Sequence, residues 1–150
     1  MKKVKRITLA GNIIINKKKE IFLLYRIKHQ FYETPGGKLR VSECRDMRMP
    51  TLEELKQTAQ RELFEEVDGI KEIISMEYFG KINFKVPDGR KAVAHKFITK
   101  VKGNLYAGEK IFDKNKSMFI YYNKLEEYPL SRDLRLLLPR IKKYFEDTNP

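Results

Sequence analysis

The sequence contains one cysteine, no tryptophan and no apolar run of the length that crosses a membrane. The single thiol, Cys44, cannot close an internal disulfide, which fits a reducing compartment. A membrane-spanning helix needs about 20 consecutive apolar residues, and the lysine-rich start at Met1 is not followed by the core of a signal peptide. These absences predict a soluble cytoplasmic protein with no membrane partner.

Acidic residues are also scarce relative to basic ones, because 20 Asp and Glu stand against 32 Lys and Arg and leave a net charge of +12. This excess indicates an anionic partner such as polyphosphate or nucleic acid. The lysines are scattered and no basic–aromatic nucleic-acid motif is present, so a general bias towards lysine explains the charge equally well. With 41% hydrophobic residues over 150 positions, we expect one globular domain, residues 1–150.

Segments of strand length occur in both halves of the sequence. Hydrophobic and β-branched residues predict strands at 5–15, 21–27, 73–86, 92–101 and 117–122, with a bend at Gly80. The polar residues 16–19 predict a hairpin between the first two strands, and the turn sequence at 87–90 predicts a second hairpin. Residues 102–116 are polar and predict a loop.

Two further segments predict helices. Thr51 and Glu54 form a T-x-x-E capping box directly after Pro50, so the first helix should begin there and run to about residue 67. The Asp-Gly pair at 68–69 predicts its end, with a left-handed cap. The second helix begins at 131–133 and contains Pro139, which should kink or restart it. One helix in mid-chain and one at the end predict an α+β fold, with helices covering a mixed β-sheet.

Three carboxylates have a distinctive position on the first helix. At about 100° per residue, Glu62 and Glu66 lie at the edge of the apolar stripe that packs on a core, and Glu65 lies beside them. Carboxylates at i, i+3 and i+4 repel one another unless a cation lies among them. A solvated acidic patch is the alternative, but clustered oxygen ligands with an open side suit Mg²⁺ or Mn²⁺.

This helix and the residues before it resemble the Nudix box, the signature of the Nudix (MutT-like) hydrolases. Residues 61–66, Arg-Glu-Leu-Phe-Glu-Glu, match its R-E-U-x-E-E core. Gly36 and Gly37 match the glycine turn that opens the box, and Glu53 stands at the spacing of its first glutamate. Two features depart from the family pattern: residues 41–50 are an insertion, and the final glycine is displaced by one position to Gly69.

The resemblance implies an α/β/α sandwich, in which the box forms a loop–helix–loop against a mixed β-sheet and a C-terminal helix completes the fold. It also implies hydrolysis of a pyrophosphate bond in a nucleoside diphosphate linked to another moiety, with Mg²⁺ or Mn²⁺ as cofactor. ADP-ribose, a dinucleoside polyphosphate and a nucleoside triphosphate are the expected substrates. Family members are often dimers, so a homodimer is one expected assembly.

The resemblance further implies which residues act. The catalytic residues would be Arg61, Glu62, Glu65, Glu66 and Glu109, and the metal ligands would be Glu62, Glu65, Glu66 and the backbone carbonyl of Gly37. The general base would be either a glutamate of the box or a carboxylate of the loop at 102–116, where Glu109 is favoured over Asp113. Arg61 should pair with Glu65 and orient it.

Substrate contacts are expected from Gly36, Gly37 and Lys38, and an apolar wall for the base from Phe31 and Tyr32 or from Tyr78 and Phe79. His95 is expected to be packed rather than catalytic. Three alternatives stay open: an RNA 5′-end pyrophosphohydrolase, a non-catalytic Nudix-fold binding module, and an isoprenoid diphosphate isomerase. The last would need a catalytic cysteine, and Cys44 in a polar insertion is poorly placed for it.

Overall fold

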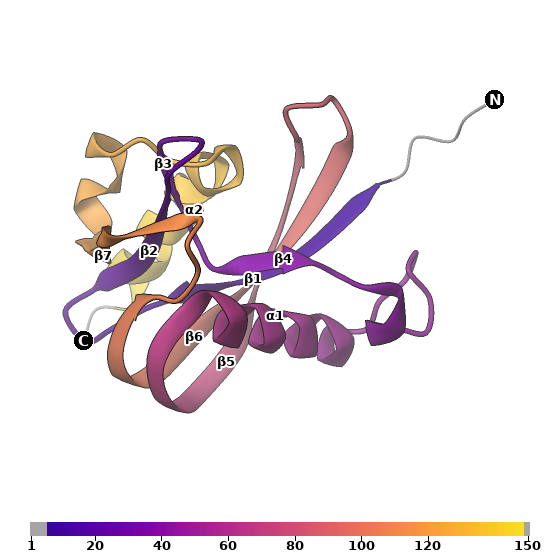
Figure 1. The fold of residues 1–150 in the computed structure, drawn as a ribbon, viewed down its shortest axis with the longest axis horizontal. Coiled ribbons are helices and arrows are strands. Elements are labelled where there is room, and N and C mark those ends of the chain that lie inside the picture. The colour runs from indigo at the N-terminus through magenta and orange to yellow at the C-terminus, as the bar shows by residue number, and fades with distance from the viewer. Residues whose placement is uncertain (1–5, 149–150) are drawn as a thin grey trace.

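The computed structural model of the chain describes residues 6–148 (Figure 1). The elements in chain order are β1 (Ile7–Ile14), β2 (Glu20–Arg26), β3 (Phe31–Glu33), β4 (Gly36–Lys38), η1 (Val41–Glu43), α1 (Leu52–Glu66), β5 (Val67–Lys85), β6 (Lys91–Ala107), β7 (Phe112–Tyr121), η2 (Tyr122–Glu127) and α2 (Arg132–Asp147).

The strands form two sheets, one with the order β4-β1-β6-β5 and one with the order β3-β2-β7. Strands β1 and β6 run parallel, with Ile7 opposite Ala92 and Ile14 opposite Thr99. All other pairings between named strands are antiparallel. The expected mixed sheet is therefore confirmed, as is the hairpin of β5 and β6 around the turn at 87–90.

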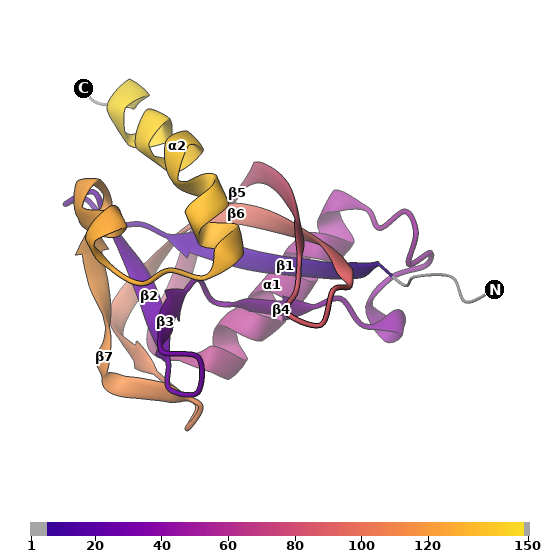
Figure 2. The same cartoon turned by 90° about the horizontal axis from the view of Figure 1, so that it is seen from above.

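The two long helices cover opposite faces of the sheets (Figures 1 and 2). Neighbouring residues of a strand point to opposite faces, and Ile13 packs with the α2 residues Leu134 and Ile141, whereas Ile14 packs with Leu63 of α1. Both faces of β1 are thus buried, and its buried polar residue Asn12 is hydrogen-bonded to the backbone carbonyl of Ala59. The expected α+β sandwich is confirmed.

Helix α1 begins where the capping box predicts. Thr51 is the N-cap, its side chain accepts from the backbone N–H of Glu54, and the Glu54 carboxylate accepts from the backbone N–H of Thr51. The predicted left-handed cap at 68–69 is wrong, because Val67 is the C-cap in an extended conformation and the chain continues directly into β5. Gly69 has a φ of +87° but lies in a bulge of β5, where its missing Cβ makes room for the carbonyl of Asn104.

Three other local predictions are wrong for a common reason: long-range pairing decides these segments. Strands β1 and β2 belong to different sheets and share only the isolated Ile15–Ile21 bridge, so they are not a hairpin. Gly36 and Gly37 are not a turn but lie in β4, paired with β1. The loop expected at 102–116 shrinks to residues 108–111, because β6 stays paired with β5 as far as Ala107.

Two further predictions concerned single residues, Gly80 in β5 and Pro139 in α2. The bend expected at Gly80 is present as a register shift beside it, with a φ of +148°. Pro139 neither breaks nor restarts α2, which runs through it from Arg132 to Asp147. Between residues 6 and 148, no helix has the length and apolar composition needed to span a membrane.

Candidate active site

Strand β4 places two glycines against the acidic face of α1. Gly36 pairs with Gly11 and Gly37 pairs with Ala10 of β1. A Cβ on Gly36 would lie 2.7 Å from the Cα of Gly11, so the two strands approach more closely than side chains allow. A Cβ on Gly37 would instead overlap the carboxylate of Glu62. The glycines therefore bring bare backbone into contact with the α1 glutamates.

Glu66, the last residue of α1, is a buried acid beside other acids. It is 5% exposed, and its Oε1 accepts a hydrogen bond of 2.7 Å from the backbone N–H of Gly36. Burial is the main cause that raises the pKa of Glu66 to about 9, and the carboxylates of Glu62, Glu33 and Glu109 add to it. Within residues 6–148 no cationic side chain pairs with Glu66. Its surroundings therefore favour a bound positive charge.

Arg61 is hydrogen-bonded to the two other predicted metal ligands of α1, Glu62 and Glu65. Its Nη1 donates to Glu62 at 2.7 Å and to Glu65 at 3.2 Å, which confirms the expected pairing with Glu65. Its Nη2 donates to the backbone carbonyl of Lys38 at 2.9 Å. One guanidinium thus fixes two carboxylates and the end of β4 relative to one another.

The remaining partner of Arg61 is Glu43 in η1. Arg61 Nε donates to Glu43 Oε2 at 2.6 Å and Nη2 donates to Oε1 at 2.9 Å, and these bonds hold the pKa of Glu43 below its usual range. Glu53, to which spacing assigned the place of the first glutamate, is instead exposed in the first turn of α1. The extra residues of this chain therefore lie between Glu43 and Arg61. Counting forward from Gly37 instead of backward from Arg61 would have found Glu43.

Glu109 lies in the short loop between β6 and β7 and faces the same acidic group. Burial raises its pKa, and the carboxylates of Glu62 and Glu65 raise it further. The loop is tied to the end of α1, because the N–H of Gly108 donates to the backbone carbonyl of Glu66 at 2.8 Å. The charge of Glu109 thus interacts with the charges of two predicted metal ligands, Glu62 and Glu65.

Asp113, the other candidate base, serves a local turn. Its carboxylate accepts from the backbone N–H groups of Asn115 and Lys116, at 2.9 and 3.1 Å. Those bonds occupy its Oδ1 and give Asp113 a structural role at this turn.

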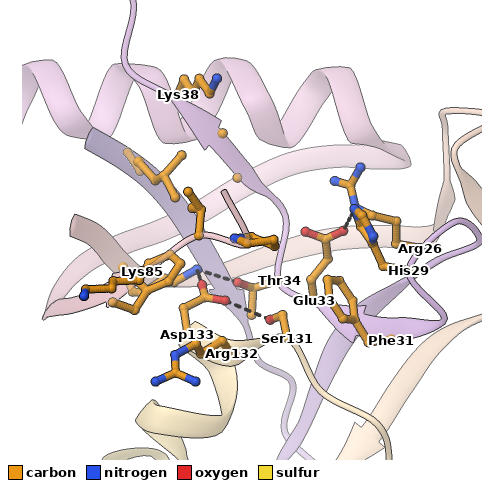
Figure 3. Close-up of a pocket in the computed structure, with 18 residues that line it drawn as sticks. Arg26, His29, Phe31, Glu33, Thr34, Lys38, Lys85, Ser131, Arg132 and Asp133 are labelled. Carbon is orange, nitrogen blue, oxygen red and sulfur yellow. Dashed lines mark hydrogen bonds and ion pairs between the residues drawn. The ribbon is translucent and has the colours of Figure 1, made fainter. Parts of the chain in front are cut away.

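A pocket of about 950 Å³ includes Gly36 and Gly37 in its lining (Figure 3). Glu62, Glu65 and Glu66 do not line it and are reached across Gly36 and Gly37, which do. The cationic side chains of the lining are Arg26, Lys38, Lys85, Lys96 and Arg132, and the phenylalanines are Phe31 and Phe84. The volume is that of a small-molecule site.

A buried ion pair joins two walls of this pocket. Lys96 of β6 is 4% exposed, and its Nζ donates to Thr34 Oγ1 at 2.7 Å and pairs with Asp133 Oδ2 at 2.9 Å. Ser131 donates to the other Asp133 oxygen at 2.8 Å. Burial alone would raise the pKa of Asp133, but the charge of Lys96 and the hydrogen bonds from Lys96, Ser131 and the Leu134 backbone together hold that pKa below its usual range. Sequence reasoning missed this pair, although a lysine inside the apolar run 92–99 was a signal for it.

A second unpredicted pair lies at the opposite wall. Glu33 and Arg26 form an ion pair and both line the pocket (Figure 3). Burial raises the pKa of Glu33, although Arg26 acts against this. Because the Glu33 charge also raises the pKa of Glu66, Glu33 belongs to the electrostatic surroundings of the acidic group.

Solved structures share this architecture. The structure of the MutT Nudix hydrolase from Burkholderia pseudomallei matches with a TM-score of 0.70 at 18% identity, over 90% of this chain and 97% of that one. The MutT protein from Methanosarcina mazei Go1 matches with a TM-score of 0.68 at 20% identity, over 99% and 100% of the two chains. The chain has the Nudix fold.

A third match is the Nudix domain of Shewanella oneidensis NrtR, solved in complex with ADP ribose, with a TM-score of 0.68 at 14% identity over 97% of this chain and 90% of that one. No protein-family model matches the sequence, and no curated protein matches it. At such identities the assignment of the Nudix fold rests on the structural match.

Within the Nudix fold, the predicted apolar wall divides between pocket and core. Phe31 lines the pocket, whereas Tyr32, the next residue of β3, points into the core and donates its hydroxyl to the carbonyl of Lys116 at 3.1 Å. Tyr78 is hydrogen-bonded to His95 at 3.0 Å, and neither lines the pocket. The alternation of side chains along a short strand separates Phe31 from Tyr32.

The acidic group suits a hard divalent cation by its chemistry. Glu62, Glu65 and Glu66 offer carboxylate oxygens, and Glu66 is buried without a cationic partner among the described residues. No three potential ligand side chains between residues 6 and 148 are already gathered around one point. Glu62 and Glu65 are instead engaged in ion pairs with Arg61.

Proposed function

We propose that the protein is a pyrophosphohydrolase that cleaves the phosphoanhydride bond of a nucleoside diphosphate linked to another moiety. The observation that carries this proposal is the buried Glu66 carboxyl, set beside Glu62 and Glu109 and separated only by two glycines from a pocket with a basic lining. The candidate cation ligands on α1 and the candidate phosphate contacts in the pocket would thus both adjoin strand β4. Hydrolysis of a charged anhydride needs both.

Glu62, Glu65 and Glu66 would hold Mg²⁺ or Mn²⁺, with the Gly37 carbonyl as a further ligand. The bound cation would neutralise charge on the pyrophosphate oxygens and lower the pKa of the attacking water. Arg61 orients two of these glutamates, and the Gly36 N–H fixes Glu66.

Glu109 is the candidate general base. Its raised pKa moves this carboxyl towards the range in which it can accept a proton near neutral pH. Its loop is anchored to α1, so its distance from the metal ligands is set by the fold rather than by a free loop.

The pocket would take the nucleoside part of the substrate. Lys38, Lys85 and Arg132 can contact phosphate oxygens, and Phe31 and Phe84 offer apolar faces for a base or sugar. The similarity to a Nudix domain solved with ADP ribose supports a substrate of this size. ADP-ribose, a dinucleoside polyphosphate or a nucleoside triphosphate meet these requirements.

An RNA 5′ end is the second candidate substrate. Arg40, Arg45 and Arg48 are exposed in and beside the insertion, next to the Glu43–Arg61 pair. They could contact phosphates beyond the reacting group. This activity would show a steep dependence on salt, because each contact releases counterions.

The test measures phosphate and nucleotide release with Mg²⁺ and with Mn²⁺ from ADP-ribose, diadenosine tetraphosphate, common and 8-oxo nucleoside triphosphates, and 5′-triphosphate RNA. We expect turnover of one class by the parent, a loss of at least about 100-fold in Glu66→Gln, and turnover within twofold of the parent in Glu53→Gln, an exposed glutamate of the same helix. Ligand binding without turnover by the folded parent would overturn the proposal in favour of a binding module.

A further inference from the structure

A second cavity, of about 560 Å³, lies at the opposite end of α2 from the pocket described above. The first pocket is lined by Asp133 in the first turn of α2, and the second by Tyr144 near its end. At 1.5 Å per residue these positions are roughly 17 Å apart along the helix axis. The two cavities share no lining residue, so the second is not an extension of the first.

The pairing of β5 with β6, two strands that line this cavity, contains several register shifts. Register shifts occur between Asp68 and Ile70, between Ile70 and Glu72, and between Ile73 and Ser75. Such bulges increase strand twist and re-aim side chains. Ile74, within the last of these shifts, is 54% exposed and faces the cavity.

The lining is mostly apolar. Its hydrophobic residues are Ile15, Ile74, Val101, Leu105, Phe119, Tyr144 and Phe145, drawn from β5, β6, β7, α2 and the chain after β1. Of these, only Ile15 and Phe145 are buried, and the other five are partly or well exposed. Five side chains thus leave apolar surface facing a concave space, and a ligand with an apolar body would bury it.

The charged residues of the lining are all lysines. Lys17 and Lys100 are exposed and have no hydrogen-bonding or ion-pair partner among residues 6–148. Lys19 donates to the backbone carbonyl of Phe145 at 3.4 Å, which ties the chain between β1 and β2 to the end of α2. Among residues 6–148 no carboxylate lines the cavity. The positive charges of Lys17 and Lys100, which have no ion-pair partner among the described residues, therefore lie beside a mostly apolar cavity.

We propose that this cavity is a second ligand site, which binds a small organic anion with an apolar body and one carboxylate, sulfonate or phosphate group. The apolar body lies against Leu105 and Tyr144, and Lys17 and Lys100 contact the anionic group. The size of the cavity fits a ligand of this kind and is too small for a helix of a partner protein, which is about 10 Å across. The proposal is independent of the chemistry at Glu66.

The probe for this site is 8-anilinonaphthalene-1-sulfonate, compared by fluorescence titration with the uncharged N-phenyl-1-naphthylamine. We expect saturable binding of the sulfonate to the folded parent. Lys100→Gln should weaken it by about threefold to fivefold, the size of one partly exposed charge contact, and should leave the binding of the uncharged probe unchanged. Lys17→Gln should act in the same direction.

Lys91→Gln is the matched control, because Lys91 is an exposed lysine at the other end of the same strand and lines neither cavity. It should bind the sulfonate as the parent does. In ¹H–¹⁵N spectra the probe should shift the amides of Lys17, Val101 and Gly103. Equal affinity of the Lys100 and Lys91 variants, or shifts confined to Gly36 and Lys38 of the first pocket, would overturn the proposal.

Discussion

Arg61 and Glu43 form a two-point ion pair that connects α1 to η1, with Nε–Oε2 and Nη2–Oε1 distances of 2.6 and 2.9 Å. Both side chains are less than a fifth exposed. The fork geometry of arginine fixes its orientation when two nitrogens are engaged. Glu43 therefore sets the direction in which the remaining nitrogen meets Glu62 and Glu65.

Glu43→Gln should consequently lower the activity without removing a metal ligand. An amide cannot accept two charge-assisted bonds, so Arg61 loses its fixed orientation. We expect kcat to fall about 10- to 100-fold, the usual effect of losing a group that orients metal ligands, with KM little changed. In a double-mutant cycle with Arg61→Lys the two losses should be far from additive. Additive losses would show that Glu43 acts through another route.

The two glycines of β4 should respond differently to alanine. At Gly37 the atoms nearest the added methyl belong to the flexible end of Glu62, so the fold should persist while Glu62 is displaced and activity falls. At Gly36 it meets the backbone of Gly11, so stability should fall by about 1–3 kcal/mol. Thermal unfolding and turnover of both variants check this. A Gly37→Ala protein that is fully active would contradict the place assigned to Glu62.

Local features of the fold could be predicted from sequence, and distant pairings could not. The start of α1 depends on Thr51 and Glu54, three residues apart, and the side of the helix on which Glu62 and Glu66 lie follows from its period. The parallel pairing of β1 with β6 joins residues more than 80 positions apart, and no local pattern contains it. The apolar run of β1 fits a hairpin equally well, which is why that prediction was wrong.

The same distinction holds for the site. The acidic cluster was found because one helix carries it, and the resemblance to the Nudix box named its members. Lys96 and Asp133 come from β6 and α2 and meet only in the folded protein. Glu43 was missed because the insertion separates it from Arg61, so that spacing along the chain indicated Glu53.

The Lys96–Asp133 pair predicts a pH dependence of stability. The pKa of Asp133 is lowered in the folded protein. The pair therefore stabilises the fold fully above the unfolded pKa, near 3.9, and this contribution is lost as the pH falls through the lower folded value. The difference in unfolding free energy between the parent and Asp133→Asn, measured with urea, should be large at pH 7 and shrink below about pH 4. A difference independent of pH would contradict this.

Removing the cation of that pair should be more costly. Lys96→Met leaves the Asp133 carboxylate buried without its partner, and we expect a loss of about 3–5 kcal/mol at pH 7. The combined variant Lys96→Met/Asp133→Asn should recover part of this loss, because no unpaired charge remains. Urea unfolding of the three variants measures both effects. A double variant less stable than Lys96→Met alone would show that charge is not the cause.

The arginines of the insertion distinguish the two candidate substrates. Arg45 and Arg48 are exposed and do not line the pocket. Their change to glutamine should leave turnover of a mononucleotide substrate within twofold of the parent. On 5′-triphosphate RNA it should reduce the slope of log affinity against log salt by about one for each arginine that contacts phosphate. An unchanged slope would exclude these residues from RNA binding.

The most direct test of the account is Mn²⁺ binding, measured by electron paramagnetic resonance on the parent, Glu66→Gln and Glu53→Gln without nucleotide. Glu66 is buried among carboxylates, whereas Glu53 is exposed on the same helix. We expect the parent and Glu53→Gln to bind Mn²⁺ with equal affinity. Glu66→Gln should bind it at least about tenfold more weakly, which is the lower range for a disturbed metal site. Equal Mn²⁺ affinity in all three proteins would contradict the placement of the metal at Glu66.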